Sequence, residues 1–409
     1  MARVMIDGIR EMPVSGRGAI TRAILMVSLV AALSACAWLV PRQPGIGQPV
    51  AWSSLPGWNS GGQAAAWPAL IRDCDRLSGR DATWATICRA AEGLPATPDD
   101  AQARQFFEQY FRAHEVIGYG GHRQGLITGY YEPILRGSLT PSARFRYPLY
   151  RRPGNLVRVD LGALYPELRG KLVRGRLDGD RVVPYYSRGQ ITNSADPLRG
   201  QELLWVDDPV ALFMLQVQGS GLVRLPDGSL IAVSYADQNG YPYVAIGNRL
   251  IQMGAIKPGA VTLQSITRWL HDHQDEAESV LNSNPSYVFF RLANAPDQGP
   301  VGAMQVVLTP QASIAVDPAY IPLGTPVWLD TTSPRGNQPY RRLMLAQDTG
   351  GAIKGPVRAD VFFGIGRDAG RLAGHMQQAG RLYVLLPDNT SGAGQRTQAA
   401  GQFSTRPTG

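Results

Sequence analysis

The chain has 409 residues, and 44% of them are apolar, which is enough for two or three domains with buried cores. Its 46 glycines and 31 prolines favour a loop-rich, β-rich protein and argue against a helical bundle. The formal net charge is +8, but Arg and Lys are scattered along the sequence, so we expect no nucleic-acid partner.

The first 35 residues are typical of a secretion signal. Arg17 and Arg22 come shortly before the apolar run 23–32, which is too short to span a bilayer comfortably, and the letters L-S-A-C end at Cys36. These letters resemble the lipobox of bacterial lipoproteins, in which the cysteine becomes the lipid-bearing first residue. An ordinary secretory signal that ends near a cysteine is the alternative. Ala37 stands where an aspartate would favour the inner membrane, so we expect a lipid anchor on the outer membrane, facing the periplasm.

Removal of residues 1–35 leaves a formal charge of about +6, because four arginines and two acids are lost. A mildly basic surface suits the acid-rich cell wall, and a solubilising balance with no partner explains it equally well. Cys74 and Cys88 then remain in an oxidising compartment, either as a disulfide or as two buried free thiols. None of the five histidines has ligand spacing to them, so we expect no metal site and no cofactor.

The chain first passes through a region without periodicity and then through a helical one. Residues 36–65 carry Pro, Gly, Gln and Ser, which predicts a tether from the membrane. The letters T-P-D-D at 97–100 match a helix start with Thr97 as the N-cap. The apolar positions behind it share one helical face that ends at His114, which we interpret as a packing residue and not as a catalyst.

The middle of the chain predicts a β-domain. A strand running into a turn is expected at 126–133, and short apolar runs broken by Gly, Pro and Asp follow up to residue 250. These runs lie at 147–150, 182–186, 211–217 and 230–235. The letters P-D-G at 226–228 predict a hairpin turn. A helical stretch over 262–281 ends at a boundary pattern, N-S-N-P.

The C-terminal part predicts a small closed barrel. Short strand candidates lie at 287–291, 301–308, 314–316, 326–329, 341–346, 361–363 and 382–386. One helix, with apolar positions over 369–376, separates the last two. Many short strands with a single helix are typical of a closed barrel. The tail 389–409 has no apolar pattern, and we expect it to be disordered.

Three aspartates, Asp317, Asp348 and Asp360, lie beside short apolar runs in this part, among glycine-rich turns. A hairpin-like return would bring Asp348 and Asp360 together. Two close carboxylates cannot both ionise easily, so one would keep a raised pKa and act as an acid near neutral pH. Capping of backbone N–H groups in turns is the alternative. The letters D-T-G at 348–350 also match aspartic proteases, but those enzymes need two such loops and this chain has one.

Several blocks together resemble the membrane-bound lytic transglycosylase A family of Gram-negative bacteria. They are L-I-T-G-Y-Y-E-P (126–133), Q-V-Q-G-S-G (216–221), Y-A-D-Q-N-G-Y-P-Y-V-A-I-G-N-R (235–249), N-P-S-Y-V-F-F (284–290) and the three-aspartate stretch. Any one block is weak evidence, whereas all of them in this order behind a lipobox are specific. The resemblance covers most of residues 65–388.

The resemblance implies a mainly β fold with some α. A double-psi β-barrel would be formed by 66–135 and 286–388. A second β-domain, 136–285, would be inserted in it, with a groove for a glycan strand between the two. The change of composition after residue 133 and the boundary pattern near residue 285 agree with these limits.

The reaction implied is cleavage of the β-1,4 bond between N-acetylmuramic acid and N-acetylglucosamine in peptidoglycan without water, which leaves a 1,6-anhydromuramic acid end. A hydrolase usually needs two carboxyl groups. Here the 6-hydroxyl of the sugar attacks, so one carboxyl can act as acid and then as base, and the attack is intramolecular. The family's catalytic acid maps onto Asp360, with Asp348 and Asp317 in supporting positions.

Five residues of the first two blocks are candidate glycan contacts: Thr128, Tyr130, Tyr131, Gln218 and Ser220. Sugars stack on aromatic faces, which suits Tyr130 or Tyr131. Their alternative is an ordinary strand or turn role.

The enzymes of the family resembled are exo-acting carbon–oxygen lyases, which cleave at chain ends. The residues of this sequence do not themselves distinguish cleavage at chain ends from cleavage inside strands. Its partners would be peptidoglycan glycan strands, the membrane through the lipid anchor, and proteins of a wall-synthesis complex. A wall-binding lipoprotein without activity remains the alternative of a different class.

Overall fold

The computed structural model describes residues 43–169, 173–193, 196–293 and 299–388. The predicted signal 1–35, the lipidation site Cys36 and the predicted tail 389–409 lie outside these ranges. Within them, no helix is long and apolar enough to cross a membrane.

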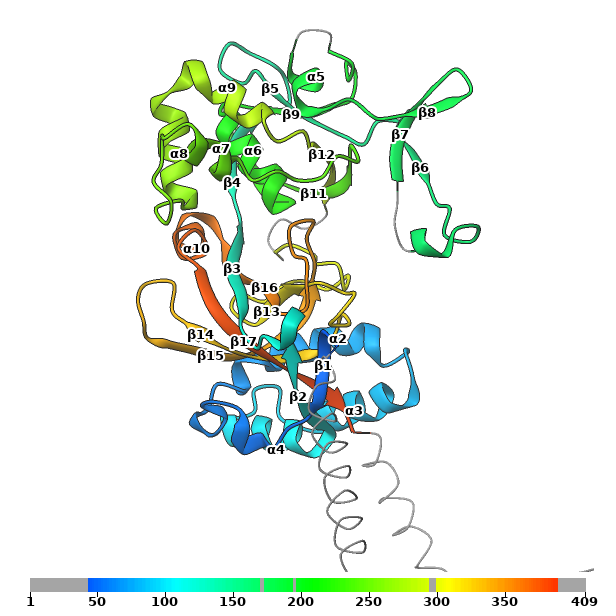
Figure 1. Ribbon diagram of the computed structural model, residues 1–409, viewed down its shortest axis with the longest axis vertical. Helices are drawn as coiled ribbons and strands as arrows, with labels where there is room; N and C mark the ends of the chain where they lie inside the picture. Colours follow the sequence, from blue (N-terminus) through cyan, green and yellow to red (C-terminus); the bar gives the residue numbers. More distant parts are fainter. Residues whose placement is uncertain (1–42, 170–172, 194–195, 294–298, 389–409) are drawn as a thin grey trace, which may run out of the picture. The chain divides into compact units, whose positions relative to one another are not determined.

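Six strands close a double-psi β-barrel (Figure 1). They are β3 (Gly125–Glu132), β13 (Ser313–Val316), β14 (Pro326–Thr332), β15 (Pro339–Asp348), β16 (Arg358–Ile365) and β17 (Gln377–Pro387). Their order is β17-β14-β15-β13-β16-β3, and β3 pairs back onto β17. β13 is parallel to β15 and β16 is parallel to β3, while the other pairs are antiparallel. Alternate apolar residues of all six strands fill the interior.

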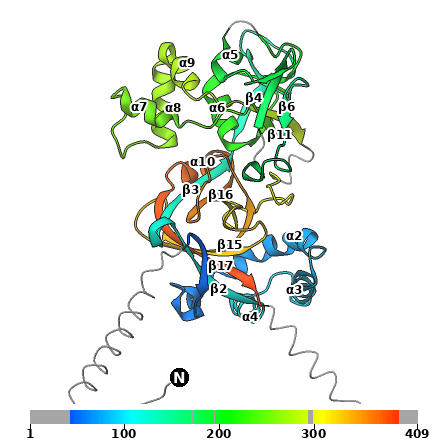
Figure 2. The same cartoon turned by 45° about the vertical axis from the view of Figure 1, so that its right-hand side comes forward.

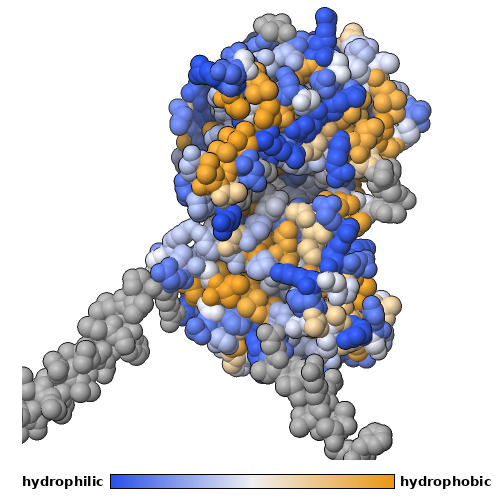
Figure 3. Space-filling model, turned by 90° about the vertical axis from the view of Figure 1, so that its right-hand side faces the viewer, coloured by the Kyte–Doolittle hydropathy of each residue, from blue (hydrophilic) through white to orange (hydrophobic). Residues whose placement is uncertain are grey.

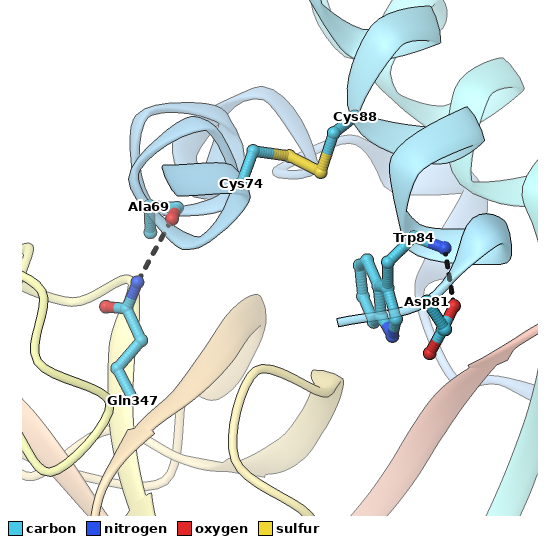
Figure 4. Close-up of a disulfide and its surroundings, with 6 residues drawn as sticks. All are labelled: Ala69, Cys74, Asp81, Trp84, Cys88 and Gln347. Atoms are coloured by element: carbon cyan, nitrogen blue, oxygen red, sulfur yellow. Dashed lines mark hydrogen bonds between the residues drawn. A yellow bond between two sulfur atoms is a disulfide. The ribbon is translucent and has the colours of Figure 1, made fainter. Parts of the chain in front are cut away.

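A helical layer covers one outer wall of the barrel. It consists of α2 (Trp67–Leu77), α3 (Ala82–Glu92) and α4 (Asp100–Tyr110), and β1 (Gly45–Pro49) and β2 (Phe111–Ile117) extend the sheet from β17. These helices share an apolar core with outward-facing residues of β14, β15 and β17. Cys74 of α2 and Cys88 of α3 are joined by a disulfide (Figure 4). The short α10 (Gly366–Ala373) packs on β3 and β16 at another side of the barrel.

A second sheet of six strands is inserted between β3 and β13 (Figure 2). Its order is β12-β11-β10-β4-β9-β5, from β4 (Ile134–Ser138), β5 (Tyr147–Tyr150), β9 (Glu202–Val206), β10 (Ser220–Arg224), β11 (Leu230–Gln238) and β12 (Val288–Ala293). The described helices of this part are α5 (Arg188–Thr192), α6 (Pro209–Gln218), α7 (Ile246–Gln252), α8 (Leu263–Asp272) and α9 (Gln274–Asn282). A three-stranded arm is formed by β6 (Val157–Val159), β7 (Val173–Asp178) and β8 (Arg181–Val183).

The structure differs from the predicted tether over 44–65. β1 pairs with β2, three short 3₁₀ turns follow, and Leu55 and Trp58 are buried. Trp58 stacks on Trp52 and meets Trp328 of β14 edge-on. The Pro-, Gly- and Ser-rich composition concealed these tryptophans, whose burial holds the segment against the barrel.

Two predicted helix features are also corrected. The N-cap of α4 is Asp99, not Thr97, and it forms a capping box with Gln102. Because α4 ends at Tyr110, His114 lies on strand β2 and not on the predicted helix. Its Nδ1 is 2.9 Å from the carbonyl oxygen of Gly47. The run 211–217 is helix α6, since burial on nearly all sides removed the helical periodicity from its sequence.

The chain enters and leaves the second sheet at other points than predicted. β4 already begins at Ile134, and β12 pairs with β11, so the chain stays in the second sheet to Ala293 and not to residue 285. The predicted strand 301–308 is an irregular segment with a single bridge between Val301 and Val307. The helical stretch after residue 262 is broken at His273 into α8 and α9.

Candidate active site

Asp348 and Asp360 are brought together by three neighbouring strands of the barrel. β13 lies between β15 and β16, and its Ala315 is opposite both aspartates. Residues opposite one another in a sheet share a face. The neighbouring Ile314 and Val361 belong to the barrel core, so Ala315 and both aspartates are on the outer face of the barrel.

Asp348 is on this face because the pairing of β15 skips one residue. Ile314 is opposite Ala346, and the next pair is Ala315 with Asp348, so Gln347 has no partner position on β13. Such a bulge turns the following side chain to the other face of its strand. The local irregularity therefore moves Asp348 from the core side to the side of Asp360.

Asp360 receives one hydrogen bond from the neighbouring strand. β16 and β3 run parallel, Asp360 is opposite Thr128, and the Thr128 hydroxyl donates to Oδ1 at 2.7 Å. None of the described residues donates to Oδ2. Burial raises the pKa of Asp360 to about 6, and the Asp348 charge adds to this, while Arg358 and the Thr128 hydrogen bond act in the opposite direction.

Asp348 is held by more donors than Asp360. The Tyr130 hydroxyl donates to Oδ2 at 3.0 Å, and the Ala303 N–H donates to Oδ1 at 3.0 Å. Burial raises the pKa of Asp348, although its hydrogen bonds with the Thr349 N–H, the Ala303 N–H and Tyr130 work against the rise. Burial and the two neighbouring carboxyl groups raise the pKa of Tyr130 well above its usual value, so its phenol remains a donor.

The packing around Gly129 leaves no room for a side chain at the centre of the block T-G-Y. A Cβ there would lie 2.6 Å from the Phe363 ring and 2.9 Å from the backbone of Ala373 on α10. Only glycine lets β3 approach this closely. The close packing sets the positions of Thr128 and Tyr130, which lie on either side of it.

Asp317 has a different environment from the other two aspartates. It directly follows β13, and its carboxyl accepts from the Gly355 N–H at 2.8 Å and from the Ala319 N–H at 3.2 Å. Gly355 belongs to the loop between β15 and β16. Asp317 therefore holds the loop that joins the strands of Asp348 and Asp360.

The other three candidate contacts lie where β3 meets the second sheet. The Gln218 amide oxygen accepts from the Tyr131 N–H at 3.1 Å, and the Tyr131 ring lies under Gly370 of α10. Ser220 hydrogen-bonds to the carboxyl of Glu132. Gln218 and Ser220 thus contact the end of β3 and not Asp360.

Sequence reasoning missed a buried polar chain behind the site. The Gln347 amide donates to Asp73 Oδ1 at 2.7 Å and to the Ala69 carbonyl at 3.0 Å (Figure 4), and it accepts from the Ser313 hydroxyl. Burial raises the pKa of Asp73 to about 7. No pattern pointed to these residues, because Asp73 lies in a helix and Gln347 directly follows the apolar run 343–346.

Two adjoining cavities lie beside the start of β17. One of about 440 Å³ is lined by residues of α6, α7 and the following loop, including Met214 and Ile246. The other, of about 550 Å³, is lined by Gln124 and Leu126 of the barrel. Gly259 and Gln377 line both. The space-filling view also shows a hollow across one face of the molecule (Figure 3).

Two family models match the chain. The MltA specific insert domain matches residues 126–291, and the 3D domain matches residues 312–386. The fold and the site define a class of proteins in which a β-barrel contains an inserted β-domain and carries aspartates on its outer face. The membrane-bound lytic murein transglycosylase A of Escherichia coli strain K12 is 34% identical over 302 residues, which are 72% of this chain and 73% of that protein. The chain belongs to the membrane-bound lytic murein transglycosylase A (MltA) family.

Solved structures agree with this membership. The membrane-bound lytic murein transglycosylase from Agrobacterium tumefaciens is 32% identical and covers 86% of this chain and 99% of its own, with a TM-score of 0.72. E. coli MltA with bound chitohexaose is 29% identical and covers 85% of this chain and 97% of its own, with a TM-score of 0.62. These likenesses span the barrel and the inserted sheet together.

Proposed function

We propose that this protein is a lytic transglycosylase of peptidoglycan. It cleaves the β-1,4 bond between N-acetylmuramic acid and N-acetylglucosamine without water and leaves a 1,6-anhydromuramic acid end. The observation that carries the proposal is Asp360, a carboxyl with a pKa of about 6 on the outer face of the barrel, one oxygen of which receives no hydrogen bond from the described residues. The relatives' name and the chitohexaose bound to E. coli MltA support a glycan substrate.

Asp360 is the acid in the first step. Its Oδ1 accepts from Thr128, so Oδ2 carries the transferable proton. A pKa of about 6 leaves a useful protonated fraction near neutral pH. Oδ2 donates this proton to the glycosidic oxygen as the bond to the anomeric carbon breaks.

The same carboxylate is the base in the second step. It accepts the proton of the muramic acid 6-hydroxyl as that oxygen bonds to the anomeric carbon. The nucleophile belongs to the substrate, so little entropy is lost in bringing the reactants together. A second carboxyl to activate water, as in hydrolases, is not needed.

The other two aspartates support this acid. Asp348, held by Tyr130 and the Ala303 N–H, raises the pKa of Asp360 and faces the positive charge that develops on the sugar ring. Asp317 holds the loop before β16 through Gly355. Thr128 and Tyr130 line the reacting position. Tyr131, Gln218 and Ser220 shape the groove where β3 meets the second sheet.

The cellular setting is proposed from the sequence. A lipid on Cys36 anchors the chain to the outer membrane, facing the periplasm, and peptidoglycan glycan strands are its partner. The word "membrane-bound" in the relatives' name supports a membrane association.

The test is the chemistry of the products released from purified sacculi by the full-length chain in detergent. Muropeptides with 1,6-anhydro ends are expected, and Asp360→Asn should release none while still binding sacculi. Reducing ends without anhydro sugars would make the protein a hydrolase. Intact glycan strands would leave only the wall-binding lipoprotein.

A further inference from the structure

Arginines on and next to the three-stranded arm surround Asp237, a buried carboxylate of β11 in the second sheet. Residues 151–188 hold nine basic and four acidic residues, an excess of five positive charges in a chain whose formal net charge is +8. Three of these arginines, Arg152, Arg158 and Arg174, contact Asp237 of β11. Arginines that stand apart within this segment are thus gathered around one carboxylate in the fold.

The contacts with Asp237 are short. The Nε groups of Arg152 and Arg158 lie 2.9 and 2.7 Å from Oδ2, and Nε of Arg174 lies 2.6 Å from Oδ1. Although burial alone would raise the pKa of Asp237, its hydrogen bonds with the three arginines and the Gln238 N–H lower it. Asp237 is therefore ionised, and three guanidinium groups share one negative charge.

Three guanidinium groups contact one carboxylate, so this group of four side chains carries more positive than negative charge. Asp237 is fully buried, whereas the side chain of Arg158 is 46% exposed. Arg152 and Arg158 each donate hydrogen bonds from Nε and Nη2. Their Nη1 groups have no hydrogen-bond partner among the described residues. Free donors on a planar guanidinium match the geometry of a carboxylate.

A fourth arginine extends the cluster. The Arg176 guanidinium lies 4.9 Å above the Tyr186 ring, and its buried Nε has no partner in the described part of the chain. Both Arg152 and Arg176 influence the pKa of Tyr185, so the two lie close to the same side chain. If the cluster only fastened the arm to β11, one arginine on Asp237 would suffice, and the further positive charges would cost free energy.

We propose that this arginine cluster binds carboxylates of the peptide stems carried by the muramic acid residues of the substrate. The proposal rests on the proposed function, because it concerns how the same substrate is held. Stem peptides carry several carboxylates, and each muramic acid of a strand can bear a stem. The cluster would add affinity for wall material that bears peptides without taking part in bond cleavage.

The test compares two substrates and a matched pair of variants in the full-length chain. Arg158→Gln removes one charge but leaves Arg152 and Arg174 on Asp237, so the fold should be retained, which thermal melting checks. Arg181→Gln removes the same charge from an exposed position on β8 of the same arm. Arg158→Lys keeps the charge and should keep most of the binding. Binding and turnover are measured on intact sacculi and on sacculi stripped of their stems by an amidase.

We expect Arg158→Gln to bind intact sacculi at least about tenfold more weakly, the effect of one lost hydrogen bond between charged groups. Its binding to stripped sacculi and its turnover of them should match the unaltered chain, and Arg181→Gln should change neither. Equal losses on both substrates, or no loss on intact sacculi, would overturn the proposal. Absence of anhydro products from the unaltered chain would count against the proposed function alone, because the binding comparison does not depend on turnover.

Discussion

At the scale of single residues, the site depends on two carboxyl groups with unequal partners. Asp348 accepts hydrogen bonds at both oxygens, whereas Asp360 accepts from Thr128 at one. A carboxylate surrounded by donors is stabilised in its charged form, and a carboxyl with a free oxygen can exchange a proton with a ligand. The more conspicuous Asp348, in its D-T-G loop, is therefore suited to support, and Asp360 is suited to proton transfer.

The basic limb of the pH–rate profile should move in opposite directions in two variants. The proposed reaction needs protonated Asp360, so kcat should fall as the pH rises through about 6. Asp348→Asn removes a charge that raises this pKa, so its limb should move to lower pH, with partial loss of rate. Thr128→Val removes a hydrogen bond that lowers the pKa, so its limb should move to higher pH.

The measurement is the release of anhydro muropeptides between pH 4 and 8 for the two variants and the unaltered chain. Shifts of the same sign in both variants would contradict the assignment of Asp360 as the titrating acid. An unmoved limb in Asp348→Asn would leave Asp348 as a structural residue.

At the scale of elements, the bulge in β15 aims Asp348 at the site. Gln347 occupies the extra position and is held from behind by Asp73 and Ala69 of α2 and by Ser313 of β13. The disulfide joins α2 to α3 one residue beyond Asp73. The helical layer thus contributes to the site, since it anchors the residue whose backbone positions Asp348.

Replacing Gln347 with leucine should lower kcat with little change in KM. The buried Asp73 and Ser313 would lose their partner, which costs about 1–3 kcal/mol of stability for each unpaired group, and Asp348 would lose its fixed position. Asp73→Asn is the matched control, because an amide oxygen can still accept from Gln347, and it should keep its activity. Steady-state kinetics and urea unfolding measure both. An active Gln347→Leu would show that the bulge does not need this anchor.

The same bulge shows what the sequence could and could not predict. The strands around the aspartates were predictable, because apolar runs alternate with Gly-rich turns over 313–387. The skipped residue was not predictable, since Gln347 is a polar residue that directly follows the apolar run 343–346, and its partner Asp73 is 274 residues away. Helix α6 was taken for a strand-like run for a similar reason, because its neighbours bury almost every side and leave no amphipathic pattern.

At the scale of the whole molecule, the barrel and the second sheet are joined through a buried acid. Glu132 ends β3, one residue before Pro133 leads into β4, and it is opposite Ile365 of the barrel. Ser220 of the second sheet hydrogen-bonds to its carboxyl, while Oε2 is buried without a partner in the described part of the chain. Burial raises the pKa of Glu132 to about 7, with the Ser220 hydrogen bond acting in the opposite direction.

This junction should make the stability of the protein depend on pH. Glu132 has a pKa near 4.5 when unfolded and about 7 when folded, so the folded chain binds the extra proton between these values. Stability is therefore lost as the pH rises from 4.5 through 7, by at most about 3 kcal/mol. Glu132→Gln cannot ionise, so its free energy of unfolding, relative to that of the unaltered chain, should increase over this window and stay constant above it. Asp73 and Asp360 titrate in both proteins, so their contributions to the free energy of unfolding cancel in the difference. Urea unfolding at pH 4.5, 6 and 8 measures it, and a difference that does not change with pH would mean that Glu132 is ionised in the fold.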